Sequence, residues 1–279
     1  MAEDWSETEV ELVVADYFEM LRAELMGDRF GKTEHRRRLV PRLNGRSDQS
    51  VEFKHANISA VLVQMYLPYI DGYKPRGNYQ RLLREGVEAY IVAHPTFFSD
   101  IVHSPVLNPT TAGAATGAAS RLFVPPPERS VVTPDDLQLP AVRKIDFVKR
   151  DAENRALGRL GEEWIVGVEK SRLLENGRDD LANRVEWVSS TRGDGLGFDI
   201  ISFNHEDDSE RHVEVKTTSL GKFFPFYVSA NELRVSEREP DAYHLYRVFG
   251  FGRDPKLFVL KGSLSATCRL QTTQYRAVI

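Results

Sequence analysis

The chain is poor in cysteine and in long apolar runs. Of its 279 residues only Cys268 carries a thiol, which excludes an internal disulfide and a cysteine-rich zinc site and suits a reducing compartment. The N-terminus, Met-Ala-Glu-Asp-Trp, lacks the apolar core of a signal peptide. No run approaches the roughly 18 consecutive apolar residues of a membrane span. We therefore expect a cytoplasmic protein that makes no membrane contact.

Several common functional signatures are also missing. The net charge of −4 gives no global sign of a nucleic-acid binder, so any such surface must be a local patch. The histidines lack H-x-x-x-H and H-E-x-x-H spacing, which argues against a zinc hydrolase. There is no G-x-x-x-x-G-K-[ST] loop to bind a nucleotide. The hydrophobic content of 41% is that of a globular protein, and the length suits one large domain or two ordinary ones.

The stretch Gly193–Thr218 contains two segments with strand character. Apolar residues dominate 198–203, and a second segment alternates around Val213 and Val215. The polar residues 204–210 between them are short enough for a hairpin connection. We therefore predict two adjacent antiparallel strands here.

This hairpin would gather three functional side chains. Alternation with a period of two places Glu214 and Lys216 on one face of the second strand and the valines on the other. The hairpin brings Asp199 towards their level, and Thr217 and Thr218 extend the polar face towards a phosphate. Hard divalent cations such as Mg²⁺ prefer carboxylate oxygens, and a neighbouring lysine can balance the charge of a phosphate. These residues predict metal-assisted phosphate chemistry.

Ordered motifs strengthen this interpretation. The segments G-D-G-L-G-F-D-I, V-E-V-K-T-T and P-F-Y-V-S-A-N-E-L resemble the PD-(D/E)xK nucleases, and more narrowly the nuclease-like domain at the C-terminus of the plant protein NO VEIN and in many bacterial proteins. The resemblance covers roughly residues 150–265. It implies an α/β fold: a restriction-endonuclease-like αβ sandwich around a mixed sheet.

The resemblance also implies roles for individual residues. Asp199, Glu214 and the carbonyl of Val215 would hold Mg²⁺, which Mn²⁺ could replace, and Lys216 would orient the attacking water. Glu162 follows a G-x-x-G pattern on the first core helix and would assist through water.

Other acidic residues compete for these roles. Glu163 and Glu169 are alternatives to Glu162, although Glu169 lies two turns further on and suits a structural ion pair. Asp194 suits a turn better than a metal ligand. Glu52 and Lys54 form another carboxylate-x-lysine pair, but a turn-like sequence precedes them instead of a strand.

The remaining elements of the C-terminal block follow from periodicity and capping signals. Gly158 and Gly161 within the first helix indicate close packing on a sheet. Ser229 with Glu232 forms a capping box that opens another helix. The predicted helix and strands lie at 146–176 (helix), 185–189, 243–249 and 256–261 (strands).

The N-terminal block predicts a mainly helical domain over residues 1–95. Ser6 and Glu9 form a capping box, and Asn57 and Asn78 are expected to cap two further helices. A proline-, alanine- and glycine-rich stretch over 96–142 predicts a linker, and 143–279 would form the nuclease-like domain.

The helical domain is a candidate DNA-recognition module. Its segments G-R-S-x-x-S-V-E-F-K-H and I-D-G-Y-K-P-R-G-N-Y-Q resemble an N-terminal domain of bacterial nuclease-linked proteins. A protein-interaction role and a plain scaffold are alternatives. Basic residues of this domain, with one from the loop beyond the predicted site, are candidates for nucleic-acid contacts: Arg36, Arg37, Arg38, Arg46, Lys54, Lys74 and Lys222.

Together these features predict a Mg²⁺-dependent endonuclease, a hydrolase that cuts DNA in restriction or anti-phage defence. A homodimer is expected, because cutting both strands takes two centres or two visits. The alternatives are a nuclease acting on RNA and a non-catalytic module that binds nucleic acid or a protein partner.

Overall fold

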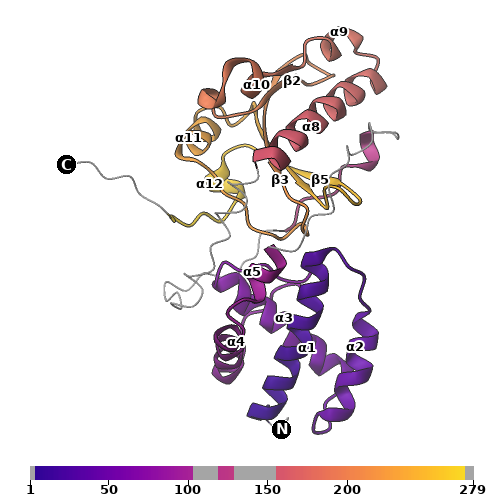
Figure 1. Ribbon diagram of the computed structural model, residues 1–279, viewed down its shortest axis with the longest axis vertical. Coiled ribbons are helices and arrows are strands. Elements are labelled where there is room, and N and C mark those ends of the chain that lie inside the picture. The colour runs from indigo at the N-terminus through magenta and orange to yellow at the C-terminus, as the bar shows by residue number, and fades with distance from the viewer. Residues whose placement is uncertain (1–3, 103–118, 129–154, 274–279) are drawn as a thin grey trace, which may run out of the picture. The chain divides into compact units, whose positions relative to one another are not determined.

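The structure, a computed structural model, describes residues 4–102, 119–128 and 155–273, and these form two compact units (Figure 1). The helical unit contains residues 4–102 together with 220–226, and the α/β unit contains the other described residues. Most of the predicted linker over 96–142 lies outside the described residues. Its described parts include α5 (Phe97–Val102) and the short helix η2 (Ala119–Arg121). Among the described residues, no helix combines the length and the apolar character that crossing a bilayer requires.

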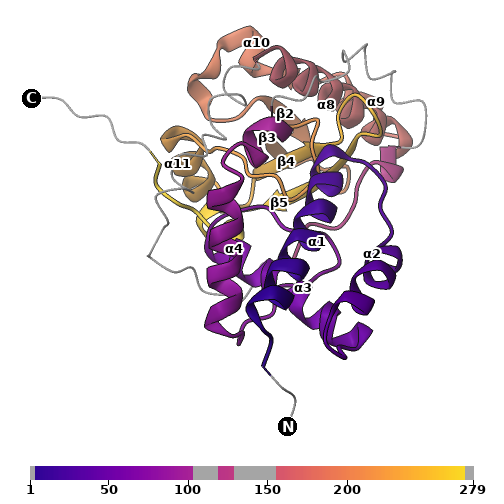
Figure 2. The ribbon, with the colours of Figure 1, turned by 60° about the horizontal axis from the view of Figure 1, so that its bottom comes forward.

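The helical unit is organised around its first helix, which contacts the three that follow (Figure 2). Ser6 and Glu9 make the predicted capping box, and the helix then buries a continuous apolar stripe. The stripe residues are Val10, Val13, Val14, Tyr17, Phe18, Leu21 and Leu25. The helices are α1 (Glu7–Met26), α2 (Lys32–Leu39), α3 (Asp48–Gln64) and α4 (Arg81–Ala93), with η1 (Val40–Arg42) after α2.

Two predicted helix caps are wrong. Helix α3 begins after Ser47, whose hydroxyl accepts a hydrogen bond from the Ser50 amide, so Asn57 lies inside the helix. The Asn57 amide group donates to the Arg76 carbonyl at 2.6 Å, an inter-segment contact that its sequence neighbours do not reveal. Asn78 has φ 62°, a left-handed conformation, whereas an N-cap residue is extended. Gln80 precedes α4 instead.

The α/β unit has a mixed sheet of five strands in the order β1-β2-β3-β4-β5. Strands β3 and β4 are parallel, with helix α11 (Ala230–Arg238) between them in the chain, and the other neighbours are antiparallel. The strands are β1 (Glu186–Trp187), β2 (Ile200–Phe203), β3 (Glu210–Thr217), β4 (Tyr243–Phe249) and β5 (Lys256–Lys261). The predicted α/β class, with a mixed sheet behind a helical N-terminal region, is confirmed.

The first predicted strand is shorter than expected. Only Glu186 and Trp187 pair with β2, because the chain turns at Val188 into the short helix α10 (Val188–Arg192). The turn η3 (Asp194–Leu196) then leads towards β2, and Asp194 lies in it as predicted. Two other short helices, α9 (Asp179–Ala182) and α12 (Leu264–Thr267), complete the unit.

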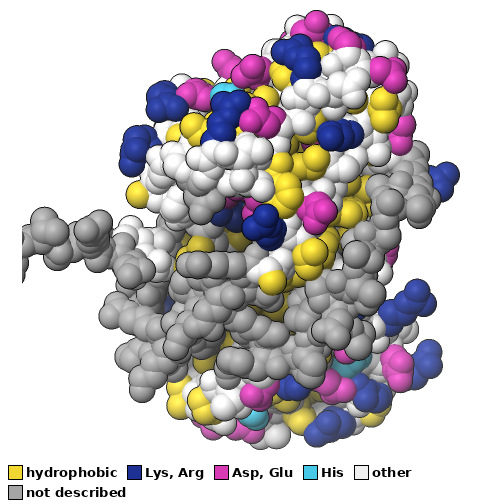
Figure 3. All heavy atoms as spheres, turned by 45° about the horizontal axis from the view of Figure 1, so that its top comes forward, with side chains coloured by type: hydrophobic (Ala, Val, Ile, Leu, Met, Phe, Trp, Pro, Cys, Tyr) yellow, Lys and Arg dark blue, Asp and Glu magenta, His cyan; other side chains and the backbone are white. Residues whose placement is uncertain are grey.

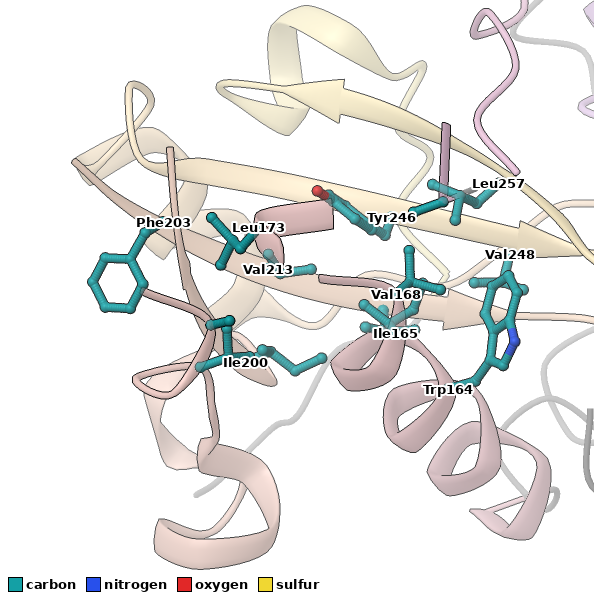
Figure 4. Packing of buried hydrophobic residues seen from close by; sticks show 14 of the residues in the cluster. Trp164, Ile165, Val168, Leu173, Ile200, Phe203, Val213, Tyr246, Val248 and Leu257 are labelled. Atoms are coloured by element: carbon teal, nitrogen blue, oxygen red, sulfur yellow. The ribbon is translucent and has the colours of Figure 1, made fainter. Parts of the chain in front are cut away.

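Helix α8 (Arg155–Glu175) packs its apolar side on one face of the sheet. Figure 4 shows Trp164, Ile165 and Val168 of this helix facing Val213 and Tyr246 of the strands. On β3 the buried valines belong to this core, so the alternate residues of the strand project from the opposite face. Glu214 and Lys216 lie on that opposite face.

Helix α8 and β3 approach most closely where Gly161 meets Thr217. A Cβ atom at Gly161 would lie 1.8 Å from Thr217 Oγ1, whereas one at Gly158 would meet nothing within 4 Å. The predicted close packing is therefore confirmed at Gly161 and not at Gly158. The expectation that Thr217 reaches a phosphate is wrong, since its side chain faces Gly161 of α8 in the core, and Thr218 beside it is only 3% exposed.

We expect Gly161→Ala to destabilise the α/β unit by about 1–3 kcal/mol, because overpacking at the Thr217 contact outweighs the better helix propensity of alanine. Gly158→Ala is the matched control on the same helix, and it should stabilise the unit by up to about 1 kcal/mol. Urea unfolding of both variants measures the difference. Equal stability of the two variants would contradict this packing.

Candidate active site

Asp199 lies directly before β2 and is fixed by backbone hydrogen bonds on both sides. Its amide donates to the Val213 carbonyl at 2.9 Å, and its carbonyl accepts from the Ser189 amide at 3.1 Å. The side chain turns towards β3, where Oδ2 accepts a hydrogen bond from the Val215 amide at 2.8 Å. The β2–β3 hairpin therefore brings the Asp199 carboxylate to the level of Val215, as the strand pattern predicted.

Glu214 and Lys216 project from the same face of β3. Lys216 Nζ lies 2.7 Å from Glu214 Oε1 and 2.8 Å from Glu232 Oε2. Glu232 belongs to the first turn of α11, where its carboxylate also accepts from the Ser229 amide in the capping box. Lys216 therefore joins β3 to α11 through the Glu232 carboxylate.

Burial and like charge shift the pKa values of both carboxylates. Burial, and then the neighbouring Glu162, raise the pKa of Asp199 from 3.8 to about 7. Burial also raises the pKa of Glu214 well above its usual value, and Lys216 only partly offsets this. Burial opposes the charged form of Lys216, but Glu214 and Glu232 outweigh it and raise the pKa of the amine. Lys216 therefore stays positively charged, with several acidic side chains around it.

Glu162 approaches the cluster from helix α8. Its Oε2 atom accepts hydrogen bonds from Trp187 Nε1 at 2.7 Å and from Ser189 Oγ at 2.6 Å. Of the two alternatives, Glu163 is exposed, and Glu169 lies in the core with Arg172 as its ion-pair partner. Glu162 is therefore the glutamate of α8 that acts electrostatically on Asp199.

The structure adds two residues that the sequence did not point to. Glu232 was assigned only to helix capping, although it also binds Lys216. The Tyr243 hydroxyl is buried and has no hydrogen-bond partner among the described residues. Burial, followed by the charge of Glu214, raises the pKa of Tyr243. The capping box with Ser229 was the one signal in the sequence at Glu232, and it pointed to helix initiation alone.

The donor set fits a hard divalent cation. Asp199 and Glu214 are carboxylates whose raised pKa values show that a positive charge would be favourable between them. The site holds four acidic side chains, Asp199, Glu214, Glu232 and Glu162, together with the Lys216 amine. The buried Arg247 guanidinium donates to the Lys216 carbonyl at 3.2 Å. The Asp199 and Glu214 carboxylates are thus the groups of this site that could hold such an ion.

Most of the predicted nucleic-acid contacts are engaged within the helical unit. Lys54 is only 8% exposed and donates to Gln80 at 2.9 Å. Glu52 forms an ion pair with Arg36. This carboxylate-x-lysine pair therefore lies on helix α3, and its side chains make contacts within the helical unit. Arg37 and Lys74 are exposed. The other pairs are Arg38 with Glu19, Arg46 with Glu9, and Lys222 with Asp71.

Basic and acidic side chains intermingle on the face shown in Figure 3. In α2, Arg36 pairs with Glu52 and Arg38 with Glu19, so each of these two cations would exchange a protein partner for a phosphate.

Comparison with known proteins agrees with the resemblance drawn from the motifs. Residues 161–260, 100 of the 279, match the protein family described as Protein NO VEIN, C-terminal. Neither a curated protein nor a solved structure matches the chain. All five charged residues of the cluster lie within the matched range, from Glu162 to Glu232. Residues 161–260 of the α/β unit are therefore similar to the NO VEIN C-terminal family.

Proposed function

We propose that the α/β unit is a Mg²⁺-dependent endonuclease of the PD-(D/E)xK class that hydrolyses phosphodiester bonds in DNA. The observation that carries this proposal is the convergence of Asp199, Glu214 and Lys216 on one spot of the sheet. Their order along the chain is that of the D…E-x-K motif, and the unit's helix-strands-helix-strands sequence agrees with the expected sandwich.

Asp199, Glu214 and the carbonyl of Val215 would hold the metal ion. When bound, Mg²⁺ lowers the pKa of a coordinated water and neutralises phosphate oxygens. The residues of the chain provide the remaining chemistry. Asp199 is already oriented by the Val215 amide, which fixes its carboxylate before any ligand arrives.

Lys216 would contact the scissile phosphate and orient the attacking water. Its amine is held at 2.7–2.8 Å by Glu214 and Glu232, so it is positioned as a protonated group. If the Glu214 carboxylate bound the metal ion, Glu232 would remain to hold the Lys216 amine in place. Glu162, held by Trp187 and Ser189, would orient a water on the side of Asp199.

The helical unit would hold or select the DNA in a restriction or anti-phage enzyme, which would act as a homodimer in the cytoplasm. Arg37 and Lys74 are exposed and would contact phosphate. Arg36, Arg38 and Lys222 would contribute by leaving their carboxylate partners.

The test is cleavage of supercoiled plasmid with Mg²⁺ by the full chain. We expect Lys216→Ala to slow cleavage by at least about 100-fold, the scale of losing one transition-state charge. Lys261→Ala, an exposed lysine of β5, is the matched control and should cut like wild type. Equal rates for the two variants would overturn the catalytic role of Lys216.

Substrate panels separate this proposal from its alternatives. Cleavage of RNA in place of linear, circular or single-stranded DNA would change the substrate class but keep the site. A chain that binds nucleic acid without cutting any of these substrates would be a binding module, and the proposal would be wrong.

A further inference from the structure

A second cluster of metal-binding side chains lies in the helical unit, on elements that the proposed nuclease site does not use. It contains Asp16 and Glu19 of α1 and His35 of α2. His35 Nδ1 lies 2.8 Å from Asp16 Oδ1, and one ligand atom from each of the three residues lies within 4.8 Å of the other two. Imidazole and carboxylate groups at this spacing form the donor set of a first-row transition metal.

A fully buried histidine of α3 lies against the same carboxylate. His55 of α3 is 0% exposed, and neither of its ring nitrogens makes a hydrogen bond to a described residue. Its Nε2 atom lies 3.4 Å from Asp16 Oδ2, which also has no hydrogen-bond partner in the described part of the chain. Ligands of metal ions commonly have such a second group behind them, which orients the coordinating carboxylate.

The packing of α2 leaves room for such a contact. Of its eight residues only His35 and Leu39 are buried, and no side chain caps its first turn. A surface hollow of about 240 Å³ opens beside it, lined by residues of α1, α2 and η1. Asp16 and Glu19 lie in the wall of this hollow, so an ion can reach them from solvent.

The side chain that now balances the cluster is replaceable. Arg38 donates to Glu19 Oε1 at 3.3 Å and lies 3.2 Å from His35 Nδ1, and its side chain is 54% exposed. A divalent cation offers Glu19 a denser positive charge at the same place, and the arginine can turn into solvent.

We propose that Asp16, Glu19 and His35 bind a divalent first-row transition metal such as Zn²⁺, with His55 orienting Asp16 from behind. The ion joins α2 to α1 and thereby fixes the helix that carries Arg36, Arg37 and Arg38. An imidazole ligand separates this site from the all-oxygen Mg²⁺ site proposed for the α/β unit. The site does not depend on that unit being a nuclease.

Titration of the full chain with Zn²⁺ tests the proposal, in a Glu214→Gln background that removes metal binding at the other site. We expect one tightly bound Zn²⁺ per chain by calorimetry and elemental analysis, together with a rise in melting temperature. Glu19→Gln and His35→Gln should each weaken binding by more than about tenfold, since losing even a partner of a ligand costs that much. Co²⁺ should give visible absorption bands that both substitutions remove.

Glu11→Gln, an exposed change on the same helix, is the matched control and should bind Zn²⁺ like the background. Glu19 is 62% exposed at its side chain, so its substitution leaves the fold intact even if His35→Gln does not. Absence of stoichiometric Zn²⁺, or equal affinity in the Glu19→Gln and Glu11→Gln variants, would overturn the site.

Discussion

Replacing Asp199 by asparagine should make the metal-free protein more stable at pH 8 and should abolish cleavage. The carboxylate is buried near Glu162, which raises its pKa to about 7. Asparagine keeps the shape, and its oxygen can still accept the Val215 amide hydrogen bond, but it carries no charge. The expected loss of cleavage is on the order of 10²–10³-fold or more, because a ligand charge at the reaction centre disappears.

The sign of the stability change follows from proton binding. Between pH 3.8, the usual pKa, and about 7, the folded chain keeps a proton on Asp199 that the unfolded chain releases. The free energy of unfolding therefore falls as pH rises through this window. Above pH 7 the whole loss of stability caused by the buried Asp199 charge is present. A shift of this size corresponds to a few kcal/mol at about 1.4 kcal/mol per pH unit.

Urea unfolding in a chelator at pH 5 and pH 8 measures this effect. Asp199→Asn should exceed wild type clearly at pH 8 and by much less at pH 5. Asp241→Asn, an exposed aspartate before β4, should follow wild type at both values. A variant that is less stable than wild type at pH 8 would contradict the buried charge at Asp199.

Replacing Glu169 by alanine is expected to cost the α/β unit about 3–5 kcal/mol of stability, the usual loss when one partner of a buried ion pair is removed. Glu169 is 0% exposed and accepts two hydrogen bonds from Arg172, at 3.0 and 2.8 Å. Ser202 Oγ and the Tyr246 hydroxyl donate to it at 2.6 and 2.9 Å. Truncation would leave these donors without their acceptor at the α8–sheet contact.

The charge itself contributes part of this stability. Burial works against the ionised form, but Arg172 and then Arg211 lower the pKa of Glu169 below its usual 4.5. The contribution is therefore present above about pH 4.5 and is lost as pH falls through the lowered folded value. Glu169→Gln, which keeps an acceptor, should lose less than Glu169→Ala.

Tryptophan fluorescence during urea unfolding can follow this unit alone. In a Trp5→Phe background the remaining tryptophans, Trp164 and Trp187, both lie in the α/β unit. Glu163→Ala, exposed on the same helix, should unfold like the background. A midpoint for Glu169→Ala equal to that of Glu163→Ala would show that the network contributes nothing.

The parts of the site that are local in sequence could be predicted, and the parts that depend on a crossover could not. Strand alternation and a short hairpin place Asp199 beside Glu214 and Lys216, because both act within a few residues. Glu232 reaches Lys216 only because β4 returns parallel to β3, which positions α11 over the strand end. No pattern within a short window encodes that return.

Local signals also failed where two of them competed. Asn57 is a good capping residue, but Ser47 offers an earlier cap with an uninterrupted helical pattern behind it. Val188 favours a strand by type, yet the chain bends there so that Ser189 can contact Glu162 and the Asp199 carbonyl. At both Asn57 and Ser189, contacts with distant segments of the chain determine the local structure.

The first turn of α11 shares one carboxylate between helix initiation and the lysine of β3. Glutamate and glutamine serve a capping box about equally well, but only glutamate supplies the negative charge that Lys216 needs. Evolutionary exchange between these two residues is thus neutral for the helix and costly for the chemistry. Glutamine at this position in a relative would indicate a domain that has kept the fold and lost the proposed cleavage.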